Sequence, residues 1–339
     1  MQTTKPKPER ILQKYLIQER TNTSFPLFHL FFSLFFLFLS TISIHSEALE
    51  KSNVLPKGSD MRLKNVRFRW IPSIFVEAEK LTLRVIPNKA GGILNFDRPE
   101  GFYFYLLNGG AIVPIPVLET IFNKQIFNKD TQPLRNLKFS VVKNDTGNML
   151  RLNGEMKLVG IWLNFEMDTV TSIDTDRNLI ELAPVKITAL GLGFVKSLLG
   201  ITPINLELLL PLEKDLPVKI EGNLIFVNAE GLFTKPKITG KLSKAFVNDN
   251  GLEVIFSNPY QPVFQNFRSD KHPNMIYIQG GNIQFGKIAI NNAKAELRDT
   301  SLQNYFDFCI STYFRSLVKG KALINPDQSV SVDIPDFVE

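Results

Sequence analysis

The sequence is poor in the residues from which catalytic and metal sites are usually built. Its 339 residues include one cysteine, Cys309, and three histidines, His29, His45 and His272. A single cysteine excludes an internal disulfide, and so few His and Cys residues leave no cluster with zinc-site spacing. No Ser-His-Asp or Cys-His arrangement can be assembled from them. We therefore expect no enzymatic activity, no catalytic residue, no metal and no cofactor.

Strong charge of either sign is also lacking. Lys and Arg number 39 against 33 Asp and Glu, a net charge of +6, and the basic residues stand singly rather than in blocks. Because basic patches with interleaved aromatic residues are typical of nucleic-acid binding, nucleic acid is not an expected partner. The small positive balance is compatible with anionic surfaces such as phospholipid headgroups.

Apolar residues, by contrast, are plentiful at 44% of the chain, and their longest run is 25–44. This run contains no acid, Lys or Arg, and at about 1.5 Å per residue a helix of this length spans a bilayer. A basic leader at 1–24 precedes it, and the positive-inside rule places that leader in the cytoplasm. The residues expected to lie within the membrane span include Phe25, Phe28, Phe32, Phe36, Leu39 and Ile44.

The predicted span is either retained in the mature protein or removed by a signal peptidase. If it is retained as a signal anchor, the chain is a single-pass membrane protein with its body in the periplasm or outside the cell. The segment Ser46-Glu47-Ala48 has small residues at the spacing that a signal peptidase accepts, so cleavage near Ala48 would release a secreted form. The length of the apolar run and of its leader favours retention.

Period-two alternation of apolar and polar residues dominates the remainder. It is clear at 66–70, 81–85 and 137–141, where one parity is apolar, as in a sheet with one wet face. The longest such run is 149–170, and its parity flips at Gly160, where a bulge or a sharp bend is expected. Asn250-Gly251 is a strong hairpin signal. Further strands are predicted at 218–228, 237–247, 252–257, 275–279, 282–290 and 329–334.

Three apolar stripes at helical spacing interrupt these strands. They predict helices at about 114–129, 184–199 and 301–319, the first opening on Pro114 and the second ending at Gly200. Each stripe is explained either by ordinary core packing or by helices that line an apolar cavity under a curved sheet. The spacing alone does not choose between these interpretations.

Together these signals predict an α+β fold in which an N-terminal transmembrane helix precedes a highly curved, mainly antiparallel sheet that wraps two or three amphipathic helices. The expected division of the chain is a basic leader at 1–24, a span at 25–44, a linker at 45–60, a curved-sheet domain at 61–260, and a region at 261–339 that completes or extends the sheet.

The pattern of the body resembles a known family. A helix at 114–129 precedes a strand, bend and strand at 137–170, which contains Leu-Asn-Gly-Glu-Met-Lys at 152–157. A second predicted helix at 184–199 follows, and Val-Lys-Ile-Glu-Gly-Asn at 218–223 then leads to Pro-Lys-Ile-Thr-Gly-Lys-Leu at 236–242. This order is similar to bacterial relatives of the tubular lipid-binding (TULIP) superfamily, which includes the bactericidal permeability-increasing protein and the SMP domains.

The resemblance covers roughly residues 101–257 and implies an envelope protein that binds or shuttles lipid acyl chains in an apolar groove, with membrane lipid as its partner. The expected groove residues are Leu118, Ile121, Phe122, Ile126, Leu190, Phe194, Leu198 and Trp162. The residues expected to attract a headgroup phosphate at the mouth are Lys124, Lys129, Arg135 and Lys138. The family has no catalytic residues to transfer to this chain.

A second hypothesis is a non-enzymatic envelope scaffold whose core is fully packed and which binds partner proteins. The two hypotheses differ in one structural respect. A continuous tunnel of roughly several hundred Å³ favours lipid binding, whereas a filled interior favours the scaffold.

Overall fold

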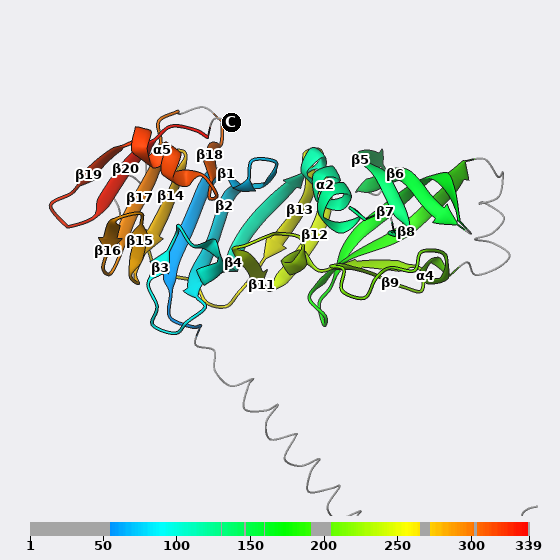
Figure 1. Ribbon diagram of the computed structural model, residues 1–339, viewed down its shortest axis with the longest axis horizontal. Helices are drawn as coiled ribbons and strands as arrows, with labels where there is room; N and C mark the ends of the chain where they lie inside the picture. The colour runs from blue at the N-terminus through cyan, green and yellow to red at the C-terminus, as the bar shows by residue number, and fades with distance from the viewer. Residues whose placement is uncertain are drawn as a thin grey trace, which may run out of the picture. The chain divides into compact units, whose positions relative to one another are not determined.

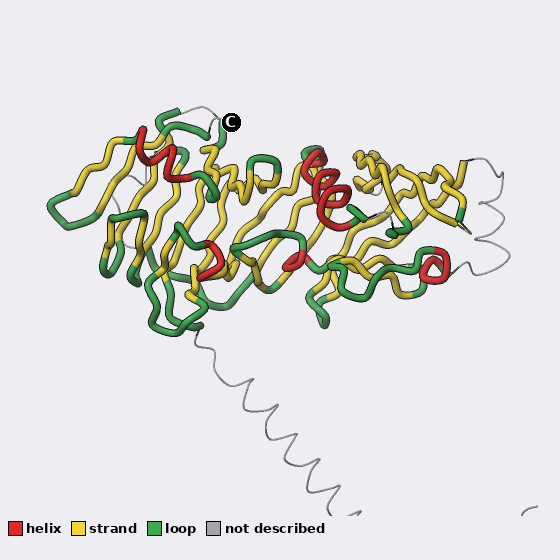
Figure 2. Tube along the Cα trace, viewed as in Figure 1, coloured by secondary structure: helices red, strands yellow, loops and turns green. Residues whose placement is uncertain are grey.

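The alternating segments of the sequence form a strand-rich structure. A computed structural model describes residues 55–129, 131–145, 147–158, 160–190, 205–264, 272–301 and 304–337. Of the described residues, strand accounts for 56% and helix for 11%, and Figure 2 shows how short the helical segments are. Residues Pro56–Glu339 form one compact unit.

The largest sheet has eleven strands, most of them antiparallel neighbours. Its C-terminal strands β14, β17, β20 and β19, orange to red in Figure 1, continue the sheet beyond β1. In spatial order its path is β12 (Leu242–Asn248), β13 (Gly251–Phe256), β4 (Phe102–Pro114), β2 (Ile74–Pro87), β1 (Ser59–Ile71), β14 (Met275–Gln279), β17 (Lys294–Asp299), β20 (Val330–Ile334) and β19 (Lys321–Ile324). Two short strands join the path in parallel, β11 (Lys237–Gly240) on β4 and β18 (Phe306–Cys309) on β1.

A second sheet has six strands, all antiparallel to their neighbours. Its order is β5 (Leu134–Asn144), β6 (Gly147–Leu158), β7 (Ile161–Asp174), β8 (Leu179–Leu190), β10 (Leu224–Val227) and β9 (Val218–Glu221). A small third sheet consists of β16 (Ile288–Ile290), β15 (Ile283–Phe285) and β3 (Leu94–Asn95). The predicted bend at Gly160 is the turn between β6 and β7, and Asn250-Gly251 joins β12 to β13 as predicted.

The parity of each strand decides which side chains enter the core. Along β1, Val66, Phe68 and Trp70 are at most 5% exposed and alternate with partly exposed arginines. The register between β2 and β4 shifts near Gly109, which has φ +122. A Cβ on this glycine would lie 2.2 Å from the Lys80 carbonyl oxygen, so only glycine allows the backbones to approach here.

One asparagine links the second sheet to the first. Asn178 opens β8 from a left-handed turn with φ 58, a conformation that asparagine tolerates better than most residues. Its side-chain amide donates to the Gly240 carbonyl at 2.8 Å and accepts from the Leu242 amide at 2.8 Å. This pair of hydrogen bonds ties β8 to the point where β11 passes into β12.

The helices are few and short in the described part of the chain. They are α2 (Ile115–Ile121), which continues as the π-helical turn η3 (Phe122–Ile126), then α4 (Leu206–Leu209) and α5 (Tyr313–Lys319), with single 3-10 turns at η2 (Pro99–Gly101) and η4 (Ala229–Gly231). The helix predicted at 114–129 is therefore confirmed as α2 with η3.

The other two helix predictions need correction. The described part of 184–199 is strand, because β8 runs to Leu190 and pairs along its length with β7. A register shift opposite Pro184 accommodates the proline within that pairing. The stripe at 301–319 contains strand β18 and then helix α5, because Phe306 to Cys309 pair with β1. The spacing of a short apolar run is compatible with both a helix and a strand, and pairing with a neighbouring strand decides between them.

The predicted fold class is wrong as a whole. The described part of the chain is mainly β rather than α+β, and no described helix is wrapped by a sheet. The apolar faces that long helices were expected to cover are instead covered by short segments such as α2 and η4.

The prediction of a single-pass membrane protein with a signal anchor is also corrected. Within the described ranges, no helix has both the length and the apolar character needed to cross a bilayer. The span predicted at 25–44, with its six representative residues, lies outside the described residues.

Candidate functional site

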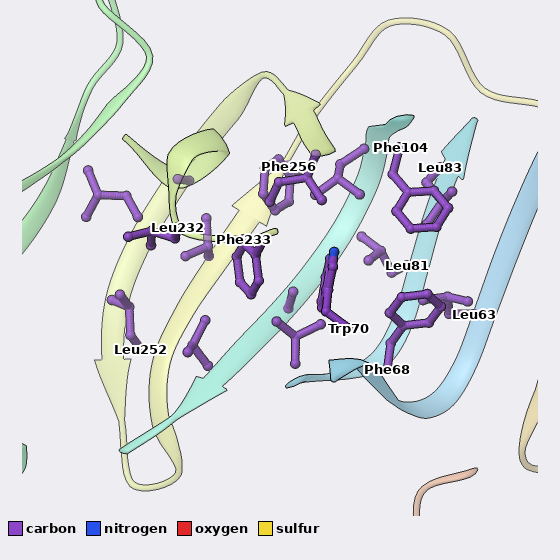
Figure 3. Close-up of a pocket in the computed structure, with 18 residues that line it drawn as sticks. Leu63, Phe68, Trp70, Leu81, Leu83, Phe104, Leu232, Phe233, Leu252 and Phe256 are labelled. Carbon is purple, nitrogen blue, oxygen red and sulfur yellow. The ribbon is translucent and has the colours of Figure 1, made fainter. Parts of the chain in front are cut away.

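A first apolar space lies against the inner face of the eleven-stranded sheet (Figure 3). Strands β1, β2, β4, β13 and β11 form most of its wall, one residue of β8 contributes, and the segment after β10 closes it. The lining residues are Leu63, Phe68, Trp70, Val76, Leu81, Leu83, Phe104, Leu106, Ala111, Val113, Ile180, Ala229, Leu232, Phe233, Ile238, Leu252, Val254 and Phe256.

This first space has apolar walls and is narrow. Every lining residue is hydrophobic, and the labelled side chains in Figure 3 carry one polar atom, the indole nitrogen of Trp70. The side chains bound a volume of about 650 Å³, part of it open to solvent, but the centre of a water-sized sphere can occupy only about 40 Å³. The smaller figure is the one that compares with cavity volumes, and it corresponds to about three waters. A bound chain therefore requires the walls to separate.

One wall is the covering segment, residues 229–236, which contains no strand. Its Phe233 ring stacks on the Trp70 indole with centroids 4.4 Å apart. The Trp70 Nε1 donates to the Pro236 carbonyl oxygen at 3.0 Å. Trp70 thus contacts the covering segment through both its ring and its indole N–H, and we call it the latch of this segment.

A second apolar space lies against the inner face of the six-stranded sheet. The side chains bound about 620 Å³, of which about 30 Å³ admits the centre of a water-sized sphere. All lining residues but one threonine are apolar: Phe122, Phe127, Leu134, Phe139, Leu150, Leu152, Met156, Phe165, Met167, Thr169, Leu182, Ile187, Leu206, Leu210, Leu212, Val218, Ile220 and Ile225.

The two apolar spaces meet along β8. Ile180 lines the first space and Leu182 lines the second, and the two side chains are 1% and 6% exposed. Residues two apart in a strand point to the same face, about 7 Å from each other. The two spaces are therefore neighbours on one continuous apolar face rather than separate features.

A polar cleft adjoins the first apolar space. The centre of a water-sized sphere can occupy about 190 Å³ of it, more than in either apolar space. Ile238 lines both the cleft and the first apolar space. The cleft is lined by Asn88, Glu100, Phe102, Tyr103, Glu230, Lys235, Lys237, Ile238 and Thr239. Burial raises the pKa of Tyr103, and neighbouring Tyr105 adds to this, so the Tyr103 hydroxyl is a neutral donor at physiological pH.

The predicted groove residues have different positions. Leu118, Ile121 and Ile126 are buried in the core, and Phe122 lines the second apolar space. Trp162 is partly exposed, and the Arg135 guanidinium lies 4.0 Å from the centroid of its ring. The side chain of Leu190, together with Phe194 and Leu198, lies outside the described residues.

Three of the four predicted headgroup residues form ion pairs. Lys129 Nζ lies 3.1 Å from Glu213, Arg135 Nε lies 2.7 Å from Glu155, and Lys138 Nζ lies 3.3 Å from Glu119. Lys124 is exposed at the last turn of η3. None of the four lines either apolar space or the polar cleft.

The residues that sequence reasoning missed are those of the first apolar space and the polar cleft. The alternation at 66–70 marked Phe68 and Trp70 as inward-facing, but it carried no sign that the 229–236 segment would close over them. Lys235 and Lys237 flank a proline, a local sign of a turn and not of a cleft.

The site offers no set of metal ligands, since the described chain contains no group of three or more His, Cys, Asp or Glu side chains placed to hold an ion. Comparison with protein-family models, with curated proteins and with solved structures finds no match to this chain. The function is therefore argued from the geometry of the apolar spaces and the cleft.

Proposed function

We propose that the protein binds the acyl chains of a lipid in the apolar interior formed by its two sheets. The observation that carries this proposal is that two neighbouring apolar spaces meet along β8, each bounded by eighteen residues of which all but Thr169 are hydrophobic. A surface of this kind has no chemistry to offer a polar substrate. It binds flexible hydrocarbon, which needs no directional partner.

The energetics favour such a ligand once the covering segment opens. Each methylene removed from water contributes about 0.8 kcal/mol, so ten methylenes contribute about 8 kcal/mol before the ordering of the chain is subtracted. An apolar cavity of this kind stays dry, so no ordered water has to be displaced. Opening requires the loss of the Trp70–Pro236 hydrogen bond, which contributes about 1 kcal/mol. Opening also separates the Trp70–Phe233 stack and moves the buried Leu232 and Phe233 side chains, so the bound chain has to replace their apolar contacts as well.

The resemblance to the TULIP superfamily is consistent with this proposal and stays a prediction. Lipid binding in that family uses an apolar groove under a curved sheet, which is the kind of site that the two apolar spaces would form when open. Shuttling of lipid between donor and acceptor surfaces is the corresponding activity.

One observation favours the second hypothesis, a non-enzymatic scaffold that binds partner proteins. The room for water-sized spheres is about 40 Å³ in the first space and about 30 Å³ in the second. These volumes belong to a closely packed interior, as a scaffold would have. The two functions therefore differ in whether the interior opens to a hydrocarbon chain.

The chain contains two tryptophans, and their positions provide a direct test. Trp70 lines the first apolar space, whereas Trp162 is partly exposed beside Arg135. Trp162→Phe leaves Trp70 as the only indole, and Trp70→Phe leaves Trp162. Lipid with brominated acyl chains quenches indole fluorescence on contact, so we expect strong, saturable quenching in Trp162→Phe and little in Trp70→Phe.

The contrary result is equally informative. If neither single-tryptophan variant is quenched after incubation with brominated lipid, and native mass spectrometry shows an unchanged protein mass, the interior stays closed and the scaffold hypothesis stands. Quenching of Trp162 alone would show lipid on the outer surface and contradict binding in the first space.

A further inference from the structure

The polar cleft gathers four charged side chains of both signs. Lys235 and Lys237 supply two positive charges, and Glu100 and Glu230 supply two negative charges, so the charges on its walls sum to zero. All four residues are exposed to solvent. The cleft is thus electrically neutral overall but strongly polar locally.

These four charges are not paired with one another. In the described part of the molecule, neither Lys235 nor Lys237 has a hydrogen-bonding or ion-pairing side-chain partner, and the Glu100 carboxylate has none either. Glu230 accepts a hydrogen bond from the Thr239 hydroxyl and has no basic partner. Some lysines elsewhere do pair with a carboxylate, as Lys129 does with Glu213. The cleft therefore keeps both kinds of charge available to a ligand.

The cleft and the first apolar space share their walls. In the covering segment, Leu232 and Phe233 line the apolar space, whereas Glu230 and Lys235 line the cleft. On β11, Ile238 lines both. A chain that enters the apolar space past this segment would have its polar end in the cleft.

We infer that the polar cleft binds a zwitterionic headgroup, a phosphate joined to a primary amine, on the lipid whose acyl chains occupy the first apolar space. This inference rests on the proposed function and deepens it. The ammonium groups of Lys235 and Lys237 donate to the phosphate, and the carboxylates of Glu100 and Glu230 accept from the amine. The neutral Tyr103 hydroxyl supplies a further donor to a phosphate oxygen.

A cleft with two charges of each sign discriminates among headgroups. An anionic headgroup without an amine satisfies the lysines but leaves the two carboxylates facing a negative ligand. A lipid with no headgroup charge leaves all four charges hydrated and gains nothing from the cleft. The zwitterion alone complements both pairs, so specificity follows from the arrangement of charge rather than from its sum.

The test uses the full-length chain with Trp162→Phe, so that quenching of Trp70 reports occupancy of the first space. Three probes carry the same brominated acyl chains: phosphatidylethanolamine, phosphatidylglycerol and diacylglycerol. We expect phosphatidylethanolamine to bind at least tenfold more tightly than the other two. Lys235→Gln combined with Lys237→Gln should remove this advantage, bringing phosphatidylethanolamine to within twofold of diacylglycerol, and leave diacylglycerol binding unchanged.

Two further variants strengthen the test. Lys241→Gln combined with Lys244→Gln is the matched control, because both lysines are exposed and neither lines the cleft, and it should bind all three probes normally. Glu230→Gln leaves the cleft with one net positive charge, so the preference should shift from phosphatidylethanolamine toward phosphatidylglycerol. This second variant keeps the inference testable if the double lysine variant is poorly folded.

The outcomes separate the inference from the proposed function. If no probe quenches Trp70, acyl-chain binding itself is wrong. If diacylglycerol quenches as well as phosphatidylethanolamine, or phosphatidylglycerol binds best, acyl-chain binding stands and the headgroup inference is overturned. Free phosphoethanolamine should compete at least a hundredfold less well than the lipid. Equal competition would show that the cleft takes a free phosphate-amine compound and would overturn its link to the apolar space.

Discussion

The two apolar spaces are alike in composition but differ in what surrounds them. The first is closed by the covering segment, residues 229–236, which Trp70 holds in place, and a polar cleft shares its wall at Ile238. The second is bounded by η3, α4 and the six-stranded sheet and includes Met156, Met167 and Thr169. Apolar lining by itself therefore does not mark a functional site. The neighbouring cleft and the covering segment distinguish the first space from the second, and the proposed lipid binding uses this difference.

The largest expected effect tests whether the two spaces belong to one cooperative core. Phe104→Ala in the first space and Phe165→Ala at the second should each lower the free energy of unfolding by about 3–5 kcal/mol. Because Ile180 and Leu182 connect the spaces along β8, both variants should shift a single denaturant-unfolding transition. Two separate transitions, each sensitive to one substitution, would contradict a single cooperative core and show that the two sheets unfold independently.

A second contrast concerns two buried carboxylates, Asp168 in the six-stranded sheet and Asp299 in the eleven-stranded sheet. The hydrogen bond from Arg151 lowers the pKa of Asp168, whose oxygens lie 2.6 and 2.9 Å from the guanidinium nitrogens. Burial raises the pKa of Asp299. Stability from Asp168 is thus present above its ordinary pKa of 3.8 and is lost as pH falls through the lowered value. Stability from protonated Asp299 is present below 3.8 and is lost as pH rises through the raised value.

Unfolding measured across pH 2–8 checks both signs. The destabilisation caused by Asp168→Asn should grow as pH rises, reaching about 1.5–3 kcal/mol near neutrality, the usual contribution of a hydrogen bond to a charged group. The destabilisation caused by Asp299→Asn should instead diminish as pH rises. Parallel pH profiles for the two variants would contradict the opposite pKa shifts.

A smaller effect separates the two tryptophans. Trp70→Phe keeps an aromatic ring against Phe233 but removes the hydrogen bond to the Pro236 carbonyl, at a cost of about 1 kcal/mol. If this bond latches the covering segment, the rate of lipid release, followed by native mass spectrometry, should rise about fivefold. Trp162→Phe is the matched control, because its ring contacts Arg135 away from both spaces, and it should leave the release rate unchanged.

The smallest effect concerns the basic residues predicted to attract a headgroup. Lys138→Ala removes an exposed ion pair with Glu119 and should change stability by less than about 1 kcal/mol. Because Lys138 lines neither space nor cleft, lipid binding should be unaffected. A loss of lipid binding in this variant would move the headgroup site to the α2–β5 region and away from Lys235 and Lys237.

Much of the strand structure could be predicted from local pattern, and the helices only in part. Alternation located β1, β2 and β5 because a half-buried strand exposes every second residue. The stripe at 184–199 was misassigned because Ile187 and its neighbours fit a helix face as well as a strand face. Its described part is strand because β7 provides a partner edge. The two strands are joined by a short turn at 175–178, but the spacing within 184–199 does not show that this segment pairs with the strand before it.

The same distinction applies to the site. Inward-facing residues such as Phe68 and Trp70 were identifiable from parity, because period two assigns each side chain to a face. Which inward-facing residues enclose a space depends on the covering segment, which joins β10 to β11 and lies more than 150 residues beyond Trp70. The polar cleft has the same origin, since Glu100 and Lys235 come together through the parallel pairing of β11 on β4.

By itself, the amino-acid sequence determined that this protein has a large apolar core, many alternating strands and few residues suited to chemistry. Composition and period are local properties, and they decide which face of a strand is buried. The tertiary structure alone decided that two apolar spaces meet on β8 and that a neutral but highly charged cleft borders one of them. These features depend on pairings between distant strands, and the free energy of such pairings is set by the whole fold rather than by any one segment.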